Sequence, residues 1–204
     1  MIGSSGLLFA VELVAVLAAA FSGFAESQRK DMDVVGVFTV AFITAFGGGT
    51  LRDVLLDRRP FFWVQHESYV VLIFALSLVA TPMMRHAHRI IPNAGFIAAD
   101  AIGLGFFSIV GVSLALEAGM PTFTATMMGV ITGVFGGVLR DVILNEVPIV
   151  LRDNRPYAIT AFIGCWFYVL LRGTGADEAL ALWTSAALIT VTRLIAWRRD
   201  WSLK

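Results

Sequence analysis

The sequence predicts an all-α membrane protein in which seven transmembrane helices form two inverted three-helix repeats and one additional helix. Three observations predict this class. Of the 204 residues, 58% are apolar and 15% are charged, a balance that a water-soluble domain of this size would not keep in solution. Seven apolar segments are long enough to be considered as bilayer spans. One of them, near residue 50, is repeated near residue 138.

A spanning helix needs about 20 mainly apolar residues, and short connections join the candidates. The first candidate resembles the core of a signal peptide. Because Glu12 interrupts it and no basic residue precedes it, we expect it to be retained as a span. The seven predicted spans are 7–25, 34–57, 69–87, 96–116, 122–145, 157–172 and 179–197.

An internal duplication is the most informative pattern in the chain. Residues 46–60 match residues 134–148 at 8 of 15 positions, at an offset of 88 residues. The same offset, without a gap, also pairs Glu12 with Asp100, Gly23 with Gly111, Met32 with Met120, Thr44 with Thr132, Tyr69 with Tyr157 and Phe74 with Phe162. Each copy holds three spans, so the second copy must enter the membrane from the opposite side. We therefore expect repeats at 1–88 and 89–172, and a seventh helix with a cytoplasmic tail at 173–204.

Loop cations predict the orientation, because Lys and Arg accumulate on the cytoplasmic side of short loops. One side carries only Arg58, Arg59 and Arg172. The other side carries Arg29, Lys30, Arg85, Arg89, Arg152, Arg155, Arg198, Arg199 and Lys204. The prediction is an outside N-terminus and a cytoplasmic C-terminus.

Glycines interrupt the two equivalent spans 34–57 and 122–145. The first contains Gly47, Gly48 and Gly49 in succession, and the second contains Gly136 and Gly137. Each glycine costs about 1 kcal/mol of helix propensity relative to alanine, so we expect both helices to kink or unwind there. Freed backbone is tolerated at membrane depth only inside protein or along a wet cavity.

A polar stripe accompanies the glycines. Thr44, Gly48 and Arg52 lie at helical spacing i, i+4 and i+8. Thr132, Gly136 and Arg140 repeat this spacing in the second copy. We assign both stripes to a pore between the two helices. The alternative is that the glycines only let these helices pack closely, while the arginines pair with acids or extend to an interface.

The intramembrane arginines call for acidic partners, since an unpaired charge at the bilayer centre costs at least ~2.5 kcal/mol. Asp53 and Asp141 follow Arg52 and Arg140 directly, but adjacent residues point about 100° apart on a helix. We therefore expect each arginine to pair across the interface between the repeats. Glu12 and Asp100, at equivalent places in the spans 7–25 and 96–116, are the alternative partners.

Several functional classes find no support in the sequence. No nucleophile elbow, phosphate loop or metal-spaced His/Glu cluster is present, so we expect neither an enzyme nor a cofactor. The 15 basic and 15 acidic residues balance, which gives no field that would attract nucleic acid. Pro60 and Pro148 follow the glycine motif at equal distances and are interpreted as helix stops. Small residues in 7–25 and 96–116 suggest a protomer contact.

The doubled Gly-Gly-x-Leu-Arg-Asp-Val signature, within two three-helix units and before a seventh helix, resembles the trimeric intracellular cation (TRIC) channel family in its prokaryotic branch. This resemblance implies a homotrimer in the inner membrane. It also implies a pore within each protomer, between the second and fifth helices, that conducts monovalent cations and favours potassium. By position, Thr44, Thr132, Arg52 and Arg140 would line or gate that path beside the glycines, with Asp53 and Asp141 less directly involved.

Two alternatives to a channel remain open. Some bacterial relatives are described as carriers of small amino acids, notably glycine, and inverted repeats with broken helices suit a carrier as well as a channel. The fold does not decide between them. A purely structural membrane scaffold is the third reading.

Overall fold

The computed structural model describes residues 2–86, 93–152 and 155–202, and this part of the chain is helical without a strand. The predicted boundary at residues 88 and 89 and the cations Arg89 and Lys204 lie outside the described residues. The helices are α1 (Ile2–Arg29), α2 (Val34–Leu55), α3 (Phe62–Gln65), α4 (Glu67–His86), α5 (Asn93–Glu117), α6 (Thr122–Ile143), α7 (Ile149–Arg152), α8 (Ala158–Gly173) and α9 (Glu178–Arg198).

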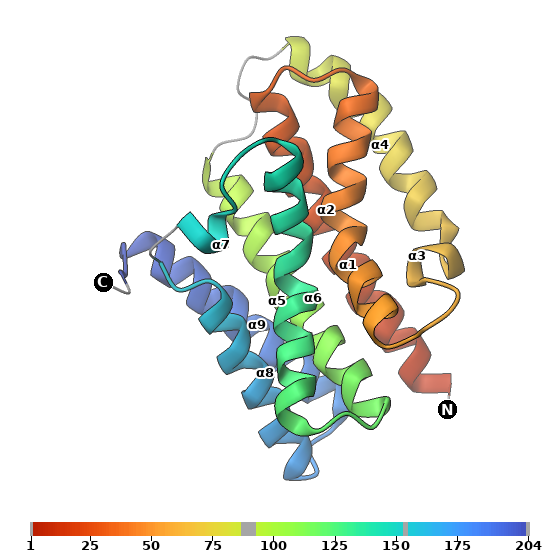
Figure 1. The fold of residues 1–204 in the computed structure, drawn as a ribbon, viewed down its shortest axis with the longest axis vertical. Coiled ribbons are helices and arrows are strands. Elements are labelled where there is room, and N and C mark those ends of the chain that lie inside the picture. Colours follow the sequence, from red (N-terminus) through yellow and green to blue (C-terminus); the bar gives the residue numbers. More distant parts are fainter. Residues whose placement is uncertain (1, 87–92, 153–154, 203–204) are drawn as a thin grey trace.

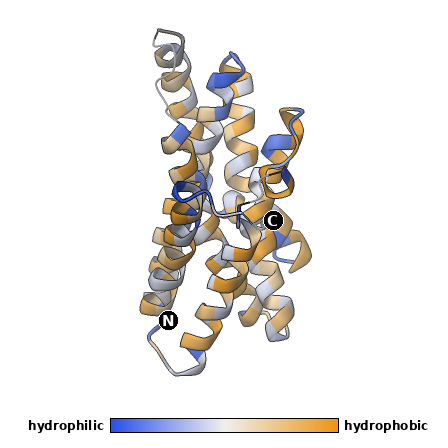
Figure 2. Cartoon of the chain, turned by 90° about the vertical axis from the view of Figure 1, so that its left-hand side faces the viewer, coloured by the Kyte–Doolittle hydropathy of each residue, from blue (hydrophilic) through white to orange (hydrophobic). Residues whose placement is uncertain are grey.

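The long helices coincide with the seven apolar segments. Five of them, α1, α2, α5, α6 and α9, are long and apolar enough to cross a bilayer, whereas the apolar parts of α4 and α8 are shorter. Apolar residues predominate along the helices that Figure 2 presents. The chain is therefore an all-helical membrane protein. The two four-residue helices α3 and α7 were not predicted.

The equivalent helices α2 and α6 end in the same way, and the prolines are not the cause. Asp57 and Asn145, with φ of 51° and 56°, adopt the left-handed conformation directly after the two helices. The next amides, of Arg58 and Glu146, bond back to the carbonyls of Asp53 and Asp141 at 2.8 Å. This is a Schellman ending, which completes the last turn. The interpretation of Pro60 and Pro148 as the helix stops is wrong, since both helices have already ended.

Helix α5 is the centre of the molecule. It contacts α1, α6, α8 and α9, and 83% of its apolar 18-residue segment is buried within the chain. The first-copy helices α1, α2 and α4 lie on one side of it, and α8 and α9 lie on the other (Figure 1). The copies meet through two pairs of equivalent helices, α1 with α5 and α2 with α6.

Small residues on α1 and α5 are used inside this chain. A Cβ on Gly105 would lie 2.6 Å from the carbonyl oxygen of Ala186 in α9, and one on Gly23 would lie 2.7 Å from the Cα of Ala41 in α2. These glycines allow backbones to approach within the protomer. The predicted contact between protomers through small residues of these helices stays a prediction.

Candidate functional site: the α2–α6 crossing and two arginine clusters

Helices α2 and α6 cross backbone to backbone at the predicted glycines. A Cβ on Gly48 would lie 2.1 Å from the carbonyl oxygen of Thr132, and a Cβ on Gly136 would lie 2.3 Å from that of Thr44. Residue numbers rise along one helix as they fall along the other, so the crossing is antiparallel. The Thr44 and Thr132 hydroxyls donate to carbonyls one turn earlier, at 2.6 and 2.7 Å. The close-packing role of the glycines, left open by the sequence, is present here.

The two helices stay α-helical through these glycines. The expected unwinding is therefore absent from α2 and α6, which the structure describes in full, while a kink there stays a prediction. Close packing of the two backbones offsets the low helix propensity of glycine. Gly47 contributes in another way, because a Cβ there would lie 2.7 Å from Cδ1 of Leu139 in α6.

The first ion-pair cluster, the Arg52 cluster, consists of Arg52, Asp53 and Glu12. The Arg52 side chain is 1% exposed, and its Nη2 and Nε lie 2.8 and 2.9 Å from Asp53 Oδ1. Its Nη1 lies 3.7 Å from Glu12 Oε1 and has no hydrogen-bond partner among the described residues. The guanidinium stands over the ring of Phe62 at 5.1 Å. This environment is mainly aromatic.

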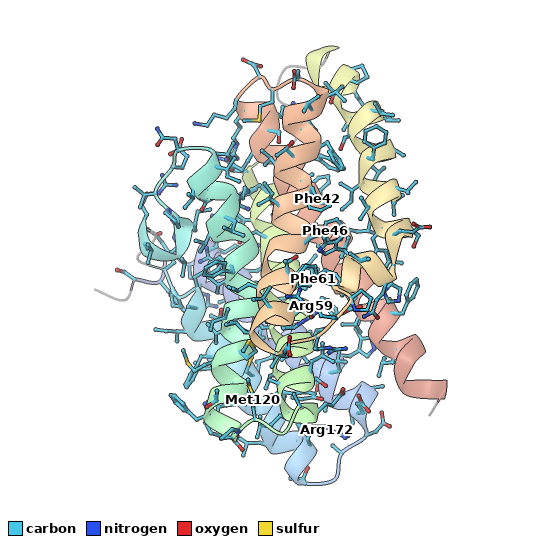
Figure 3. The ribbon with its side chains drawn as sticks, turned by 45° about the vertical axis from the view of Figure 1, so that its right-hand side comes forward. Phe42, Phe46, Arg59, Phe61, Met120 and Arg172 are labelled. Atoms are coloured by element: carbon cyan, nitrogen blue, oxygen red, sulfur yellow. The ribbon has the colours of Figure 1, made fainter. Side chains whose placement is uncertain are left out.

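Aromatic side chains extend the Arg52 cluster along α2. Phe42 and Phe46 lie one above the other on this helix, with Phe61 and Arg59 beyond its end (Figure 3). The Phe42 and Phe46 ring centroids are 4.8 Å apart, and Phe46 and Phe62 are 5.7 Å apart. Arg59 stands 4.2 Å above the Phe61 ring. Aromatic packing therefore surrounds the first cluster.

The second cluster, the Arg140 cluster, consists of Arg140, Asp141 and Asp100, and its guanidinium likewise stands over an aromatic ring, that of Phe96 at 5.0 Å. Arg140 is also 1% exposed and holds Asp141 Oδ1 at 2.8 Å through Nη2. Its Nη1 donates to Asp100 Oδ1 and to Ser22 Oγ, each at 3.2 Å. The residue equivalent to Ser22 is Val110, which has no hydroxyl. Because valine has no hydroxyl, Nη1 of Arg52 has no counterpart of the hydrogen bond that Arg140 makes to Ser22.

The expectation that the arginines pair with acids across the repeat interface is wrong. Each arginine pairs with the aspartate that follows it, because its long side chain bends along the helix surface and spans the angle between neighbouring positions. The alternative partners Glu12 and Asp100 are also used, each from the same copy as its arginine. The hydroxyl of Ser22 is the contact that comes from the other copy.

Asp53 and Asp141 each have a further partner. Their Oδ2 atoms accept hydrogen bonds from the amides of Phe62 and Ile149, both at 2.8 Å. These amides begin the short helices α3 and α7, so each aspartate joins its arginine to the chain segment that follows the transmembrane helix. Such capping satisfies amides that lack an intrahelical partner.

The last glycine of each motif has a different environment in the two copies. A Cβ on Gly49 would lie 2.3 Å from the Phe62 ring. A Cβ on Gly137 would meet only polar atoms at ordinary distances, namely the Tyr157 hydroxyl at 3.6 Å, Arg140 Nη2 at 3.7 Å and Asp100 Oδ1 at 3.8 Å. Equivalent glycines thus adjoin an aromatic ring in one copy and a polar group in the other.

A small cavity adjoins the crossing on the side of the Arg140 cluster. Its volume is about 20 Å³, which is room for one water molecule. Its polar lining consists of Ser22, Thr44, Asp100, Thr132 and Tyr157. A second, open cavity of about 870 Å³ lies beyond Asp141; we call it the charged basin. Its charged residues are Glu26, Arg29, Lys30, Asp141, Glu146, Arg152, Arg155 and Asp200.

Several residues of the site were missed by the sequence analysis. Ser22 and Phe62 carry no signal that separates them from ordinary packing residues. Tyr157 was visible as an identity with Tyr69 at the 88-residue offset. Arg193 is an ionisable residue inside the predicted span 179–197, and such a residue is by default a functional candidate.

Long apolar helices and buried ion-pair clusters define the class, a polytopic helical membrane protein. A family model described as "Glycine transporter" matches residues 9–85 and again residues 97–173. The two matches begin and end 88 residues apart, which is the offset of the duplication. The chain belongs to this family, which includes the UPF0126 membrane proteins and the prokaryotic TRIC channels.

Among its relatives, a UPF0126 membrane protein of Vibrio cholerae is 35% identical over 201 residues, which cover 98% of this chain and 82% of the relative. The UPF0126 inner membrane protein YadS of Escherichia coli is 37% identical over 158 residues, which cover 78% of this chain and 75% of the relative.

Three solved structures have the same fold. The first, a structure from work on conductance through TRIC cation channels, is 33% identical and covers 95% of this chain and 94% of its own, with a TM-score of 0.84. A TRIC orthologue from Rhodobacter sphaeroides is 30% identical, with coverages of 95% and 98% and a TM-score of 0.85. A prokaryotic TRIC channel is 25% identical, with coverages of 98% and 100% and a TM-score of 0.88.

Proposed function

We propose that the chain is a potassium-permeable channel for monovalent cations, with a pathway in each protomer between α2 and α6. The observation that carries the proposal is the α2–α6 crossing, which has beside it in each copy a buried cluster of one arginine and two acidic residues. It occurs in a chain that matches solved TRIC cation channels over 95% or more of its length. Preference for potassium over sodium is what the family resemblance implies.

The charges of the two clusters favour cations. Each cluster combines one guanidinium with two carboxylates, at 2.8 and 3.7 Å around Arg52 and at 2.8 and 3.2 Å around Arg140. Each arginine is therefore held by acidic partners, as electrostatics in a cation pathway requires, and each cluster has more carboxyl groups than guanidinium groups. Such an excess raises the local concentration of cations and lowers that of anions.

The crossing explains how the pathway would open and close. The backbones of α2 and α6 touch at Gly48 and Gly136, so an ion needs these helices to separate or slide. Glycine faces carry no side chains that would lock the two surfaces together. Once the helices separate, the Thr44 and Thr132 carbonyls and hydroxyls would replace part of the hydration shell of the ion.

The same proposal includes topology and assembly. The antiparallel α2–α6 crossing supports inverted three-helix repeats, 1–88 and 89–172, with α9 and the tail in 173–204. Arg29, Lys30, Arg152 and Arg155 gather around the charged basin, which supports a cytoplasmic location for that end and for the C-terminus. The N-terminus would lie outside, and Arg172 lies with Met120 at one end of the molecule (Figure 3). The assembly would be a non-enzymatic homotrimer in the prokaryotic inner membrane.

Single-channel recording of purified protein in planar bilayers tests the proposal. We expect discrete unitary currents in KCl and a smaller conductance in NaCl. Arg52→Gln and Arg140→Gln should each change conductance or open probability, because they alter the charge of a cluster. The matched control is Arg172→Gln, since this exposed arginine lies outside both clusters. Absence of unitary currents from folded protein, or unchanged currents in both cluster variants, would contradict the proposal.

A carrier of small zwitterions such as glycine is the second candidate. Nη1 of Arg52 is buried without a hydrogen bond among the described residues, and a guanidinium N–H is a good donor to a substrate carboxylate. Counterflow of labelled glycine into proteoliposomes discriminates between the two. Saturable counterflow without unitary current favours the carrier, unitary current without counterflow favours the channel, and neither signal favours a scaffold.

A further inference from the structure

Helix α9 stands outside the duplication, yet it brings a buried cation close to the Arg140 cluster. Arg193 is 1% exposed. Its Nη1 donates to the Pro156 carbonyl at 3.3 Å, and its guanidinium carbon lies 4.7 Å from the centroid of the Tyr157 ring. One side chain thus contacts two successive residues at the entrance of α8. A buried arginine over an aromatic face is a stabilising cation–π arrangement.

Helix α9 is held in a defined register against α5 and α8. A Cβ on Gly164 of α8 would lie 2.1 Å from Ile189, so this glycine provides the space that the isoleucine fills. Thr190 Oγ1 donates to the carbonyl of Ala101, at 3.3 Å, directly after Asp100 in the chain. Arg193 follows Ile189 by one helical turn and therefore lies on the same face. The packing of α9 consequently fixes where the Arg193 guanidinium lies.

The Tyr157 hydroxyl connects this contact to the pathway. It lines the same small cavity as the Asp100 carboxylate. The Tyr157 hydroxyl, Asp100 Oδ1 and Arg140 Nη2 all lie within 3.8 Å of the position that a Cβ on Gly137 would occupy. Asp100 in turn accepts from Arg140 Nη1 at 3.2 Å. Arg193 thus packs on Tyr157, Tyr157 lines the small cavity together with Asp100, and Asp100 binds Arg140.

The first copy lacks this arrangement. Tyr69, the equivalent of Tyr157, donates its hydroxyl to the Phe9 carbonyl at 3.2 Å, and its ring lies 5.4 Å from that of His66. Its neighbours come from α1 and from the turn before α4, and α9 packs on α5 and α8 instead. Any effect of α9 through a tyrosine should therefore be confined to the Arg140 cluster.

We propose that Arg193 is a positioning residue for the pathway. It fixes Tyr157 at the entrance of α8, and Tyr157 with Asp100 holds the Arg140 guanidinium beside the small cavity. The seventh helix thereby sets the conformation of one of two otherwise equivalent clusters. The effect on transport rests on the proposed function, whereas the coupling of these residues can be measured without it.

Two double-mutant cycles test the proposal. The first combines Arg193→Met with Tyr157→Phe, and the control cycle combines Arg193→Met with Tyr69→Phe. The free energy of unfolding is measured in mixed detergent micelles, and potassium flux is measured in liposomes. We expect each single variant of the first cycle to change flux by about threefold to tenfold. The double variant should resemble either single one, whereas the control cycle should be additive.

Two further variants separate positioning from general packing. Arg193→Lys keeps a cation over the Tyr157 ring and should restore most of the flux that Arg193→Met changes. Trp183→Leu loosens α9 against Phe106 of α5, about ten residues before Arg193 and away from Tyr157, so its effect should add to that of Tyr157→Phe. The proposal is supported if the effects of Arg193→Met and Tyr157→Phe are non-additive while those of Arg193→Met and Tyr69→Phe are additive.

The outcomes for this inference and for the proposed function are separate. If the wild type carries no potassium, the proposed function fails, and the unfolding cycle still decides on Arg193. Additive unfolding energies for Arg193→Met and Tyr157→Phe would overturn the positioning role, even in a conducting protein. So would a flux in Arg193→Met equal to that of the wild type in protein that is folded.

Discussion

The Arg52 and Arg140 clusters occupy equivalent positions in the two copies, but their surroundings differ. Both contain an arginine held at 2.8 Å by the next aspartate, and both aspartates cap a short helix. Both guanidinium groups also stand over an aromatic ring, Phe62 for Arg52 and Phe96 for Arg140, but Nη1 of Arg52 makes no hydrogen bond among the described residues. Around Arg140 the space holds Ser22, Tyr157 and a cavity of water size.

This difference shows which contacts the duplication preserves. The preserved contacts lie within the signature itself, namely the glycine crossing and the Arg–Asp pairs. The differing contacts come from outside it: Ser22 has Val110 as its equivalent, and α9 has no equivalent in the first copy. The two clusters therefore share one supporting structure but differ in the polar groups that come from outside the signature.

Replacing each arginine should cause the largest loss of stability and tests whether the two clusters differ. Arg140→Met leaves Asp100 and Asp141 buried without their cation, and breaking a buried ion pair costs about 3–5 kcal/mol. Arg52→Met should cost about 2 kcal/mol less, because its Nη1 makes none of the two charged hydrogen bonds that Arg140 makes. Unfolding in mixed detergent micelles measures both, with Arg172→Met as the exposed control. Equal losses would show that the Nη1 contacts contribute little.

The glycine crossing should respond equally from both sides. Gly48→Ala and Gly136→Ala each place a methyl group within 2.3 Å of a backbone carbonyl of the other helix. Backbone cannot move aside as a side chain can, so we expect each to lower the free energy of unfolding by about 2–3 kcal/mol. The control is Gly173→Ala, where a Cβ would meet nothing within 4 Å. A loss in only one variant would show that the crossing is not symmetric.

Much of the fold was predictable because its signals are local or periodic. Hydropathy marks each long helix. The residues of the stripe, Thr44, Gly48 and Arg52, are all buried, while their assignment to a pore stays a prediction. The helices α3 and α7 are four residues long, too short to have a periodic pattern. The continuity of α2 and α6 was not predictable either, because propensity disfavours the glycines while tertiary packing at the crossing favours them.

The candidate site was predictable in its members more than in its contacts. The duplication identified the arginines, the aspartates and both distant acids. It did not indicate that Arg52 would pair with Asp53, because this pairing depends on the length and flexibility of the arginine side chain and not on the angle between neighbouring positions on the helix. Ser22 and Arg193 act through contacts between distant segments, which no pattern along the chain records.

Replacing the last glycine of each motif with alanine should change the free energy of unfolding in opposite directions in the two copies. Gly49→Ala forces a methyl group to within 2.3 Å of the Phe62 ring, and we expect a loss of about 1–2 kcal/mol. Gly137→Ala meets atoms at 3.6 Å or more and should gain up to about 1 kcal/mol from helix propensity. The same unfolding assay measures both. Losses of equal size would contradict the different environments of Gly49 and Gly137.

The smallest effect is expected in the charged basin, where a contact joins the copies on the side of the Arg140 cluster. Lys30 donates to Glu146, and this hydrogen bond is the main cause that lowers the pKa of Glu146 below its ordinary value. The equivalents of these residues are Ala118 and Arg58, which cannot form the same pair. Glu146→Gln should change stability at neutral pH only slightly, because exposed ion pairs contribute little.

The pH dependence of this contact has a definite sign. Because the pKa of Glu146 is lower in the folded chain, its contribution is fully present above the pKa of the unfolded chain and is lost as the pH falls through the folded value. The small difference in melting temperature between wild type and Glu146→Gln should therefore vanish in acid. Lys30→Met removes the hydrogen-bond donor, so in that background Glu146→Gln should make no difference at any pH. A difference that persists in acid would show that Glu146 acts through something other than its charge.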